Sequence, residues 1–187
     1  MGHGGNVIEE LTADHREVEE LFQKIEMLPA GDTRRKALAD EAIVELIRHS
    51  VAEELHLYPA VRRLLPDGDA IADKEVEDHS SAERTMKQIE GLDAEDPDFE
   101  RLLGTWMREI RLHIEDEETN LFPKLRQAAD ADDLNQLGDK IRQAKKTAPT
   151  RPHPASPSTP PANKVLAPGA GLVDRVRDAL SGRGKSS

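Results

Sequence analysis

Histidine and glutamate residues stand at a spacing that suits metal binding. His49 precedes Glu53 by four residues, and His113 precedes Glu117 by the same interval. Residues four apart on a helix project from one face, so each pair can direct an imidazole and a carboxylate to one point. Both groups bind iron, manganese or zinc. A carboxylate can also bridge two metal ions, which then lie about 3.5–4 Å apart.

These pairs belong to an internal repeat with an offset of 64 residues. Asp14-His15 returns as Asp78-His79, and HSVAEELHLYPAVR, from His49, returns as HIEDEETNLFPKLR. One helical hairpin has therefore been used twice, and two copies pack naturally about a pseudo-twofold axis. Each copy supplies one histidine from its first helix and one His-x-x-x-Glu pair from its second. The repeat predicts a symmetric two-metal cage.

Apolar residues at three- and four-residue intervals predict the helices that must position these side chains. The first stripe runs from Ile8 to Ile25, and the second runs from Ala42 to His56, with a kink or end near Pro59. A third helix is expected at about 70–92, and a fourth opens at Asp96-Pro97, in the favoured cap-then-proline order. Short connections imply antiparallel neighbours, so we predict an all-α, up-down four-helix bundle.

The histidines and glutamates lie on the apolar stripes, where a bundle requires buried residues. Burying several imidazoles and carboxylates without compensation costs several kcal/mol per charge. A bound cation would supply that compensation, and a purely hydrogen-bonded polar core is the alternative. The chain has no cysteine, which excludes thiolate zinc sites, iron–sulfur clusters and disulfides. Nitrogen and oxygen ligands with room for six-coordination favour iron or manganese over structural zinc, and we prefer iron.

Beyond the four helices, the composition changes along the 187 residues. A fifth, short amphipathic helix is expected at about 132–144, capping a domain that spans residues 1–147. Residues 148–187 begin with the proline-rich APTRPHPASPSTPPAN, which cannot bury a core and is expected to be a disordered linker. The basic end of the chain contains GLVDRVRDALSG, a candidate for a marginal short helix. Its partner cannot be inferred.

The charge distribution argues against two classes of partner. The net charge is −11 overall, with +4 on residues 148–187 and −15 on the first 147. So acidic a body repels nucleic acid and anionic membrane, so neither is expected to bind. The opening MGHGGNVIEEL lacks a basic flank followed by an apolar stretch, and no run approaches the roughly 20 apolar residues of a membrane helix. We therefore expect a soluble, cytoplasmic protein.

The pattern resembles the hemerythrin-like, or HHE cation-binding, family over about residues 7–127, and within it the bacterial, mycobacterial-type subgroup. The motifs that carry the resemblance are DH at Asp14, HSVAEE at His49, DHSSAE at Asp78 and HIEDEE at His113, with YP and FP one turn later. The resemblance implies two iron ions in an oxo- or hydroxo- and carboxylate-bridged centre. The metal ligands it implies are His15, His49, Glu53, His79, Glu83, His113 and Glu117.

The resemblance leaves several positions open. Glu83 stands where oxygen-carrying members have a second histidine, and its repeat mate Glu19 could bind instead. Glu118 is an alternative to Glu117, and His56 is expected behind the ligands. Tyr58 and Phe122, each ahead of a proline, are expected to be packing aromatics.

The resemblance also limits the chemistry. A partly open di-iron centre reacts with small ligands: O2, H2O2 or NO. An anionic Glu83 ligand would stabilise the ferric state, which favours peroxide disproportionation, a catalase-like activity, or a response to nitric oxide over reversible oxygen carriage. The alternatives are a module that stores iron or senses iron or oxygen without turnover, and a metal-free structural bundle.

Overall fold

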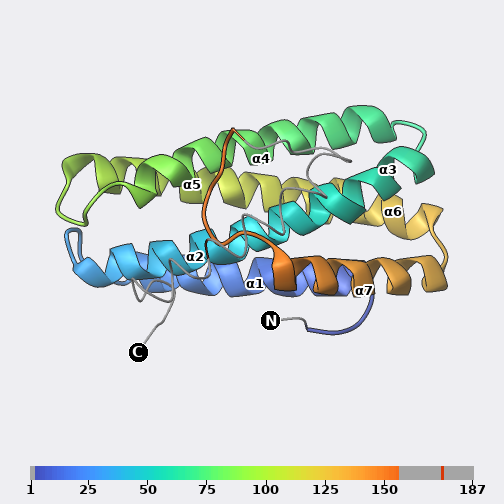
Figure 1. Cartoon of the computed structure of the whole chain (residues 1–187), viewed down its shortest axis with the longest axis horizontal. Coiled ribbons are helices and arrows are strands. Elements are labelled where there is room, and N and C mark those ends of the chain that lie inside the picture. Colours follow the sequence, from blue (N-terminus) through green and yellow to red (C-terminus); the bar gives the residue numbers. More distant parts are fainter. Residues whose placement is uncertain (1–2, 156–173, 175–187) are drawn as a thin grey trace.

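The computed structural model describes residues 3–155 and Asp174, and the regular elements within this part are helices (Figure 1). Two antiparallel hairpins form the predicted four-helix bundle. Its helices are α1 (Val7–Glu26), α2 (Thr33–Ala52), α4 (Gly68–Glu90) and α5 (Pro97–Asp116). In Figure 1, α1 and α2 lie along the lower side and α4 and α5 along the upper side. The all-α bundle expected from the apolar periodicity is confirmed.

Side-chain caps fix where three of these helices begin. Asn6 caps α1 and forms a capping box with Glu9. The side chain of Asn6 accepts from the backbone N–H of Glu9, and the side chain of Glu9 accepts from the backbone N–H of Asn6. Asp32 caps α2, and its side chain accepts from the backbone N–H of Arg34. Asp96 caps α5, with Pro97 at the first helical position, as the sequence predicts. These caps satisfy N–H groups that the first turn of a helix leaves unpaired.

The second helix of the first hairpin continues past Pro59, where the sequence predicts a kink or an end. A π-helical turn, η1 (Glu53–Leu57), joins α2 to α3 (Tyr58–Leu64). The second copy repeats this with η2 (Glu117–Leu121) and α6 (Phe122–Ala128). Pro59 therefore changes the helical register without ending the helix, because a wider π turn tolerates the missing N–H of proline.

The fifth helix, α7 (Ala131–Thr147), confirms the helix expected at 132–144. It packs against α1, α2 and η1 and lies along that hairpin in Figure 1. Its apolar stripe, Leu134, Leu137 and Ile141, is buried there. In the part of the chain described, α4 and α5 have no equivalent covering helix.

Residues 148–155 cross from the end of α7 towards α4 (Figure 1). Ala148 and Thr150 are buried, and Arg151 pairs with Glu90 at 2.8 Å. The start of the predicted linker is therefore packed on the bundle. The rest of that linker and the predicted helix GLVDRVRDALSG lie outside the described residues, apart from Asp174.

Two apolar clusters fill the bundle, one towards each end. One contains Val7, Leu11, Tyr58, Phe122 and the buried stripe of α7. The other contains residues of all four main helices, among them Phe22, Ile43, Met86 and Trp106. On every main helix the predicted ligand histidine lies between the residues of the two clusters. The fold therefore places those histidines in the middle of the bundle.

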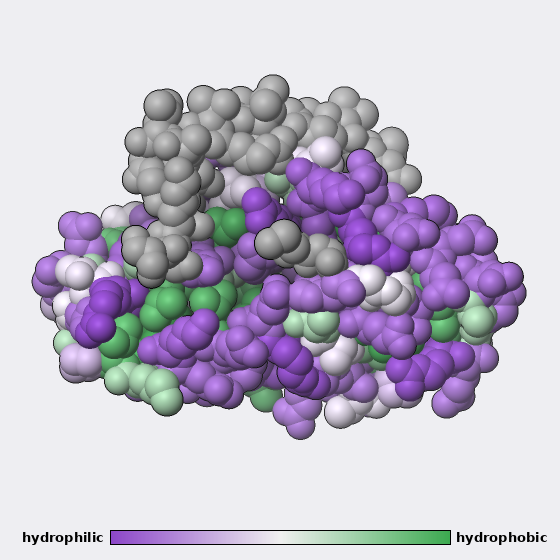
Figure 2. Space-filling model, turned by 90° about the horizontal axis from the view of Figure 1, so that it is seen from below, coloured by the Kyte–Doolittle hydropathy of each residue, from purple (hydrophilic) through white to green (hydrophobic). Residues whose placement is uncertain are grey.

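Hydrophilic side chains predominate on the face shown in Figure 2, where apolar residues form smaller patches. This agrees with a charged content of 34%. Among the described residues, none of the helices combines the length and the apolar character needed to cross a bilayer.

Two glycines inside helices allow a paired test of how α7 docks. A Cβ on Gly138 of α7 would lie 2.8 Å from the carbonyl oxygen of Gly5, whereas a Cβ on Gly104 of α5 would meet nothing within 4 Å. Alanine is favoured over glycine inside a helix by about 0.8–1 kcal/mol. Gly104→Ala should therefore raise the free energy of unfolding. Gly138→Ala should lower it by about 1–3 kcal/mol, measured by urea denaturation. Equal stabilisation by both would contradict the close packing of α7.

Candidate metal centre

Six predicted ligands meet between the two apolar clusters. They are buried side chains from the four main helices and the two π turns: His15, His49, Glu53, His79, His113 and Glu117. Both glutamates are 0% exposed, and the histidines are at most 8% exposed. The ionisable groups are therefore withdrawn from water, where charged groups need a partner.

The imidazoles form two pairs. The rings of His15 and His49 lie 5.0 Å apart, and those of His79 and His113 lie 4.9 Å apart. Glu117 completes a possible metal-binding group with the first pair, and Glu53 completes one with the second. The ligand atoms of each group lie within 4.8 Å of one another. Each group offers three donors to one ion, and an ion of iron or manganese accepts more.

Each glutamate lies between the two pairs. Oε2 of Glu53 is 3.1 Å from Nε2 of His49 and 3.4 Å from Nε2 of His79. Oε2 of Glu117 is 3.4 Å from Nε2 of His15 and 3.7 Å from Nε2 of His113. A carboxylate placed between two groups of donors is suited to bridge two ions.

The π-helical turns help to place these glutamates. Glu53 and Glu117 are the first residues of η1 and η2, and their carbonyl oxygens accept from the N–H of Tyr58 and Phe122, five residues on. Such turns occur often at functional sites because they rotate the residues that follow. One consequence is that the aromatic residue after each turn faces the cluster.

A carboxylate outside the cluster lies near the Nδ1 atom of every imidazole, and the contacts of His15, His49 and His79 are hydrogen bonds. The Nδ1 distances run from 2.9 to 3.2 Å, and the pairs are His15 with Glu118, His49 with Asp14, His79 with Glu54, and His113 with Glu75. An Nδ1–H held in this way leaves the Nε2 lone pair free for a metal ion and makes the imidazole a stronger donor. All four Nε2 atoms point into the cluster.

Two of these outer carboxylates break the symmetry of the repeat. Asp14 contacts His49, but its repeat mate Asp78 pairs with Lys74 and leaves Glu75 to contact His113. The repeat mate of Glu75 is Leu11, so a carboxylate replaces an apolar residue on that helix. That mismatch is the sequence signal from which the role of Glu75 could have been found.

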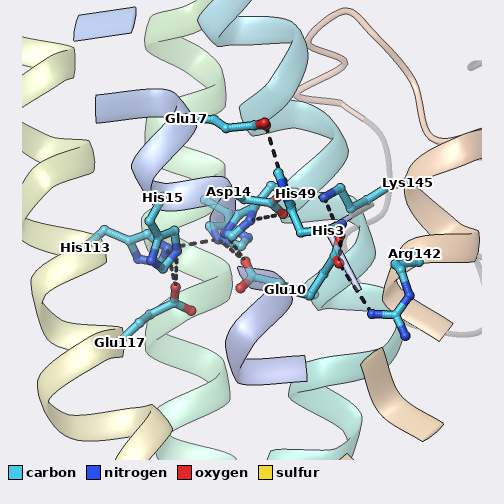
Figure 3. Close-up of polar contacts among 12 residues, drawn as sticks. His3, Glu10, Asp14, His15, Glu17, His49, His113, Glu117, Arg142 and Lys145 are labelled. Carbon is cyan, nitrogen blue, oxygen red and sulfur yellow. Dashed lines mark hydrogen bonds and ion pairs between the residues drawn. The ribbon is translucent and has the colours of Figure 1, made fainter. Parts of the chain in front are cut away.

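Asp14 is also held by α7 (Figure 3). The buried Lys145 donates to Asp14 and, at 3.0 Å, to Glu10. Burial raises the pKa of Asp14, but the contacts with His49 and Lys145 outweigh it, so the pKa lies below the usual value. Asp14 therefore stays ionised and accepts from His49.

Several buried polar atoms of the cluster have no hydrogen-bond partner, as expected of a metal site. Buried atoms without a hydrogen-bond partner include Nε2 of His15, Oε1 of Glu53 and Oε2 of Glu117. All three are atoms through which the predicted ligands could coordinate a metal ion. Unpaired buried polar atoms cost about 1–3 kcal/mol each. Metal ions between the two pairs would give these atoms partners, so the residues suit the group that the sequence predicts.

The pKa values show how the cluster balances its charge when only protons are available. Burial lowers the pKa of His49, but the charge of Glu53 and the hydrogen bond to Asp14 outweigh it and raise the pKa to about 10. The pKa of His79 rises to about 10 because Glu53 and Glu54 outweigh its burial. The imidazolium protons thus stand in for the positive charge that metal ions would bring.

Tyr58 has a larger part than the sequence suggests. The sequence favours a packing aromatic, but the Tyr58 hydroxyl lies 3.1 Å from Nε2 of His79 and donates to Glu117 at 3.2 Å. Its repeat mate Phe122 stacks on His15, with 5.8 Å between ring centroids. The repeat pattern cannot reveal this role, because a packing position and a polar one differ here by a single hydroxyl.

Glu83 does not reach the cluster, contrary to the ligand role predicted for it. Its carboxylate accepts from the backbone N–H of His153 at 2.6 Å, and it belongs to none of the possible metal groups among residues 3–155 and Asp174. Burial raises its pKa. Glu19 pairs with Arg111 at 2.9 Å, and His56 is outside the same groups. The sequence motifs do not identify Glu75. This residue lies 3.0 Å from Nδ1 of His113 and forms a possible metal-binding group with His113 and Glu117.

The comparison with known families rests on most of the described bundle. The sequence profile of the Hemerythrin HHE cation binding domain matches residues 6–125. The chain belongs to this family. The matched range covers both hairpins of the HHE domain and all six predicted ligands of the cluster.

Relatives of this HHE domain differ in how much of their length they share. An uncharacterized hemerythrin-like protein of Schizosaccharomyces pombe is 27% identical over 168 residues, which are 89% of this chain and 82% of that protein. A DNA nickase of Nostoc sp. is 24% identical over 141 residues, 75% of this chain but 39% of the nickase. Most of the nickase therefore has no counterpart in the aligned region.

A solved structure shares the fold of this HHE domain. The crystal structure of an HHE cation binding domain-containing protein from Mycobacterium kansasii superposes with a TM-score of 0.66. The match covers 75% of this chain and 85% of the other, at 22% identity. At this identity the likeness supports the helical fold alone.

The metal-free HHE domain should lose stability as the pH rises from 7 to 10. In the folded state the pKa values of His49 and His79 are about 10, against an ordinary 6.5. The stability they contribute is complete below about 6.5 and is lost as the pH passes through about 10. Urea denaturation of metal-free protein across this range measures the slope. A His49→Gln/His79→Gln variant should show a flatter slope, and an equal slope would contradict the assignment.

Proposed function

We propose that this domain binds two iron ions, one at each histidine pair, with Glu53 and Glu117 bridging them. The observation that carries the proposal is that each glutamate lies within 3.7 Å of two histidines, one from each pair. The membership in a cation-binding family supports it. Iron is favoured over structural zinc because the donors are nitrogen and oxygen and their number leaves ligand positions open.

The outer carboxylates favour the oxidised form of such a centre. Each imidazole has a carboxylate at its Nδ1 atom, which increases its donation to a metal ion and stabilises the higher charge. Glu83 cannot contribute to this effect, because its carboxylate contacts the backbone of His153 and not the cluster. Reversible oxygen carriage needs the reduced pair to persist, so peroxide disproportionation or a reaction with nitric oxide is the favoured activity.

When bound, a pair of iron ions supplies and accepts two electrons, as cleavage of an oxygen–oxygen bond requires. Tyr58 would hold a proton beside this pair. Burial and the nearby charges of Glu53 and Glu117 raise its pKa well above the usual value, so the hydroxyl stays protonated at neutral pH. It lies within 3.4 Å of Glu53, His79 and Glu117, where it can donate a hydrogen bond to an oxygen ligand.

The packed segment 148–155 favours a second candidate function, sensing of iron or gas without turnover. The backbone N–H of His153 donates to Glu83, one turn from His79 on α4. A shift of His79 on ligand binding would be passed to this segment. Release of the segment by metal or nitric oxide, without turnover of peroxide, would favour sensing.

Metal analysis tests the site assignment. Protein purified under air should contain about two irons per chain and show near-ultraviolet charge-transfer bands. His49→Ala should lose at least one iron, because it removes a ligand and leaves Glu53 and Asp14 without their imidazole. His56→Ala is the matched control, because His56 is three residues from the same glutamate but lies outside the cluster, and this variant should keep both ions. No bound metal after reconstitution would contradict the site, and two manganese ions would contradict the choice of iron.

Replacement of Tyr58 tests the reaction. Tyr58→Phe removes one hydroxyl and keeps a ring that the second repeat already accommodates as Phe122. Oxygen evolution from hydrogen peroxide should fall at least about tenfold, in line with the loss of a positioned proton donor. Iron content and the urea midpoint are the controls, and both should stay close to the parent values. If oxygen evolution is unchanged in Tyr58→Phe, the Tyr58 hydroxyl takes no part in the reaction.

A further inference from the structure

A cavity of about 430 Å³ leads from the surface between α4 and α5 to the histidines. Its inner wall includes His49, His79 and His113, all buried. Lys74 and Leu112 belong to the same lining and have side chains that are 53% and 63% exposed. The cavity therefore connects solvent with one side of the candidate metal centre.

The repeat explains why the cavity exists on one side of the bundle. The groove between α1 and α2 is covered by α7, whose Lys145 reaches Asp14. The groove between α4 and α5 has no such cover in the described part of the chain. Ala82 on its wall is the repeat mate of the larger Val18, which is packed in a core. Less side-chain volume, and the lack of a covering helix among the described residues, leave this space open.

The size of the cavity exceeds what a diatomic ligand or hydrogen peroxide needs. A water molecule takes up about 30 Å³ in the liquid, and pockets for organic ligands begin at about 300 Å³. The 430 Å³ observed falls in that second range. Leu46, Ala82 and Ile110 form apolar wall next to the imidazoles. A ligand with an apolar part packed against these three residues would have its polar end at the histidines.

Charge at the opening selects against anions. Lys74 lies 2.9 Å from Asp78 and 2.9 Å from Asp116, and 3.3 Å from Glu75, so one ammonium group faces three carboxylates. Glu109 adds another acidic side chain to the lining. A carboxylate or phosphate ligand would be repelled. An uncharged ligand would not.

We propose that this cavity is the binding site for a small organic hydroperoxide, its apolar body against Leu46, Ala82 and Ile110 and its peroxide end at the histidines. The proposal rests on the proposed function, because it names a substrate class for the same centre. Cleavage of the oxygen–oxygen bond takes two electrons, one from each ferrous ion, and two protons. It releases one alcohol and one water and leaves two ferric ions.

Binding of an unreactive probe tests the cavity without turnover. The probe is 2-phenyl-2-propanol, the alcohol that forms when cumene hydroperoxide is reduced. It should bind the iron-loaded protein in its ferric state, as measured by isothermal titration calorimetry. Ala82→Leu fills the cavity and should weaken binding at least tenfold. Thr85→Leu places the same side chain one turn along α4, outside the lining, and should bind like the parent.

A second variant guards against misfolding of Ala82→Leu. Ser81→Trp adds bulk at an exposed position of the lining, where the fold tolerates it, and should also weaken binding at least tenfold. The proposal is overturned if the parent protein does not bind the alcohol, or if both variants bind it as the parent does.

The reaction separates this proposal from the one on which it rests. Iron-loaded protein, reduced to the ferrous state, is mixed with cumene hydroperoxide or with hydrogen peroxide, and its oxidation is followed optically. The ratio of the two rate constants, organic to hydrogen peroxide, should fall at least tenfold in Ala82→Leu and not in Thr85→Leu. Reaction with hydrogen peroxide but no binding of the alcohol overturns the cavity proposal alone. Binding of the alcohol without reaction with either peroxide overturns the proposed function.

Discussion

Compensation of buried charge is the constraint on which this structure depends. Four imidazoles and two carboxylates lie in the middle of the bundle, between apolar clusters that cannot solvate them. Each imidazole has an outer carboxylate, and one of these is held in turn by Lys145. The position of α7 is thus linked to the charge of the centre, because moving Lys145 away from Asp14 would leave a buried carboxylate without this partner.

The duplicated hairpin supplies the symmetry of the centre, and the exceptions to it supply its asymmetry. Tyr58 stands opposite Phe122, Glu75 opposite Leu11, and α7 covers one hairpin in the described chain. A hydroxyl, an outer carboxylate and an open cavity consequently fall on particular sides of a cage that is otherwise balanced. Under the proposed function, two equal metal positions would react alike, whereas these differences would give one side a proton donor and a route from solvent.

The π-helical turns connect the backbone to this chemistry. They begin at the two central glutamates and end at Leu57 and Leu121, directly before the aromatic residues that precede Pro59 and Pro123. The proline ring cannot donate to the preceding turn, and the wider turn removes the need for it. The same local feature therefore sets the direction of the carboxylate and brings the following ring against a histidine.

The sequence by itself determined the bundle, the two hairpins and the meeting of six predicted ligands, because apolar periodicity and the 64-residue repeat are local patterns that encode which faces are buried. Only the tertiary structure decided which carboxylates stand behind the imidazoles. Glu83 shares a helix with His79, yet the contact with His153 holds it away, while Glu75 is brought to His113 on another helix. Contacts between helices depend on how the helices rotate and on what covers them, and spacing within one helix carries no record of either.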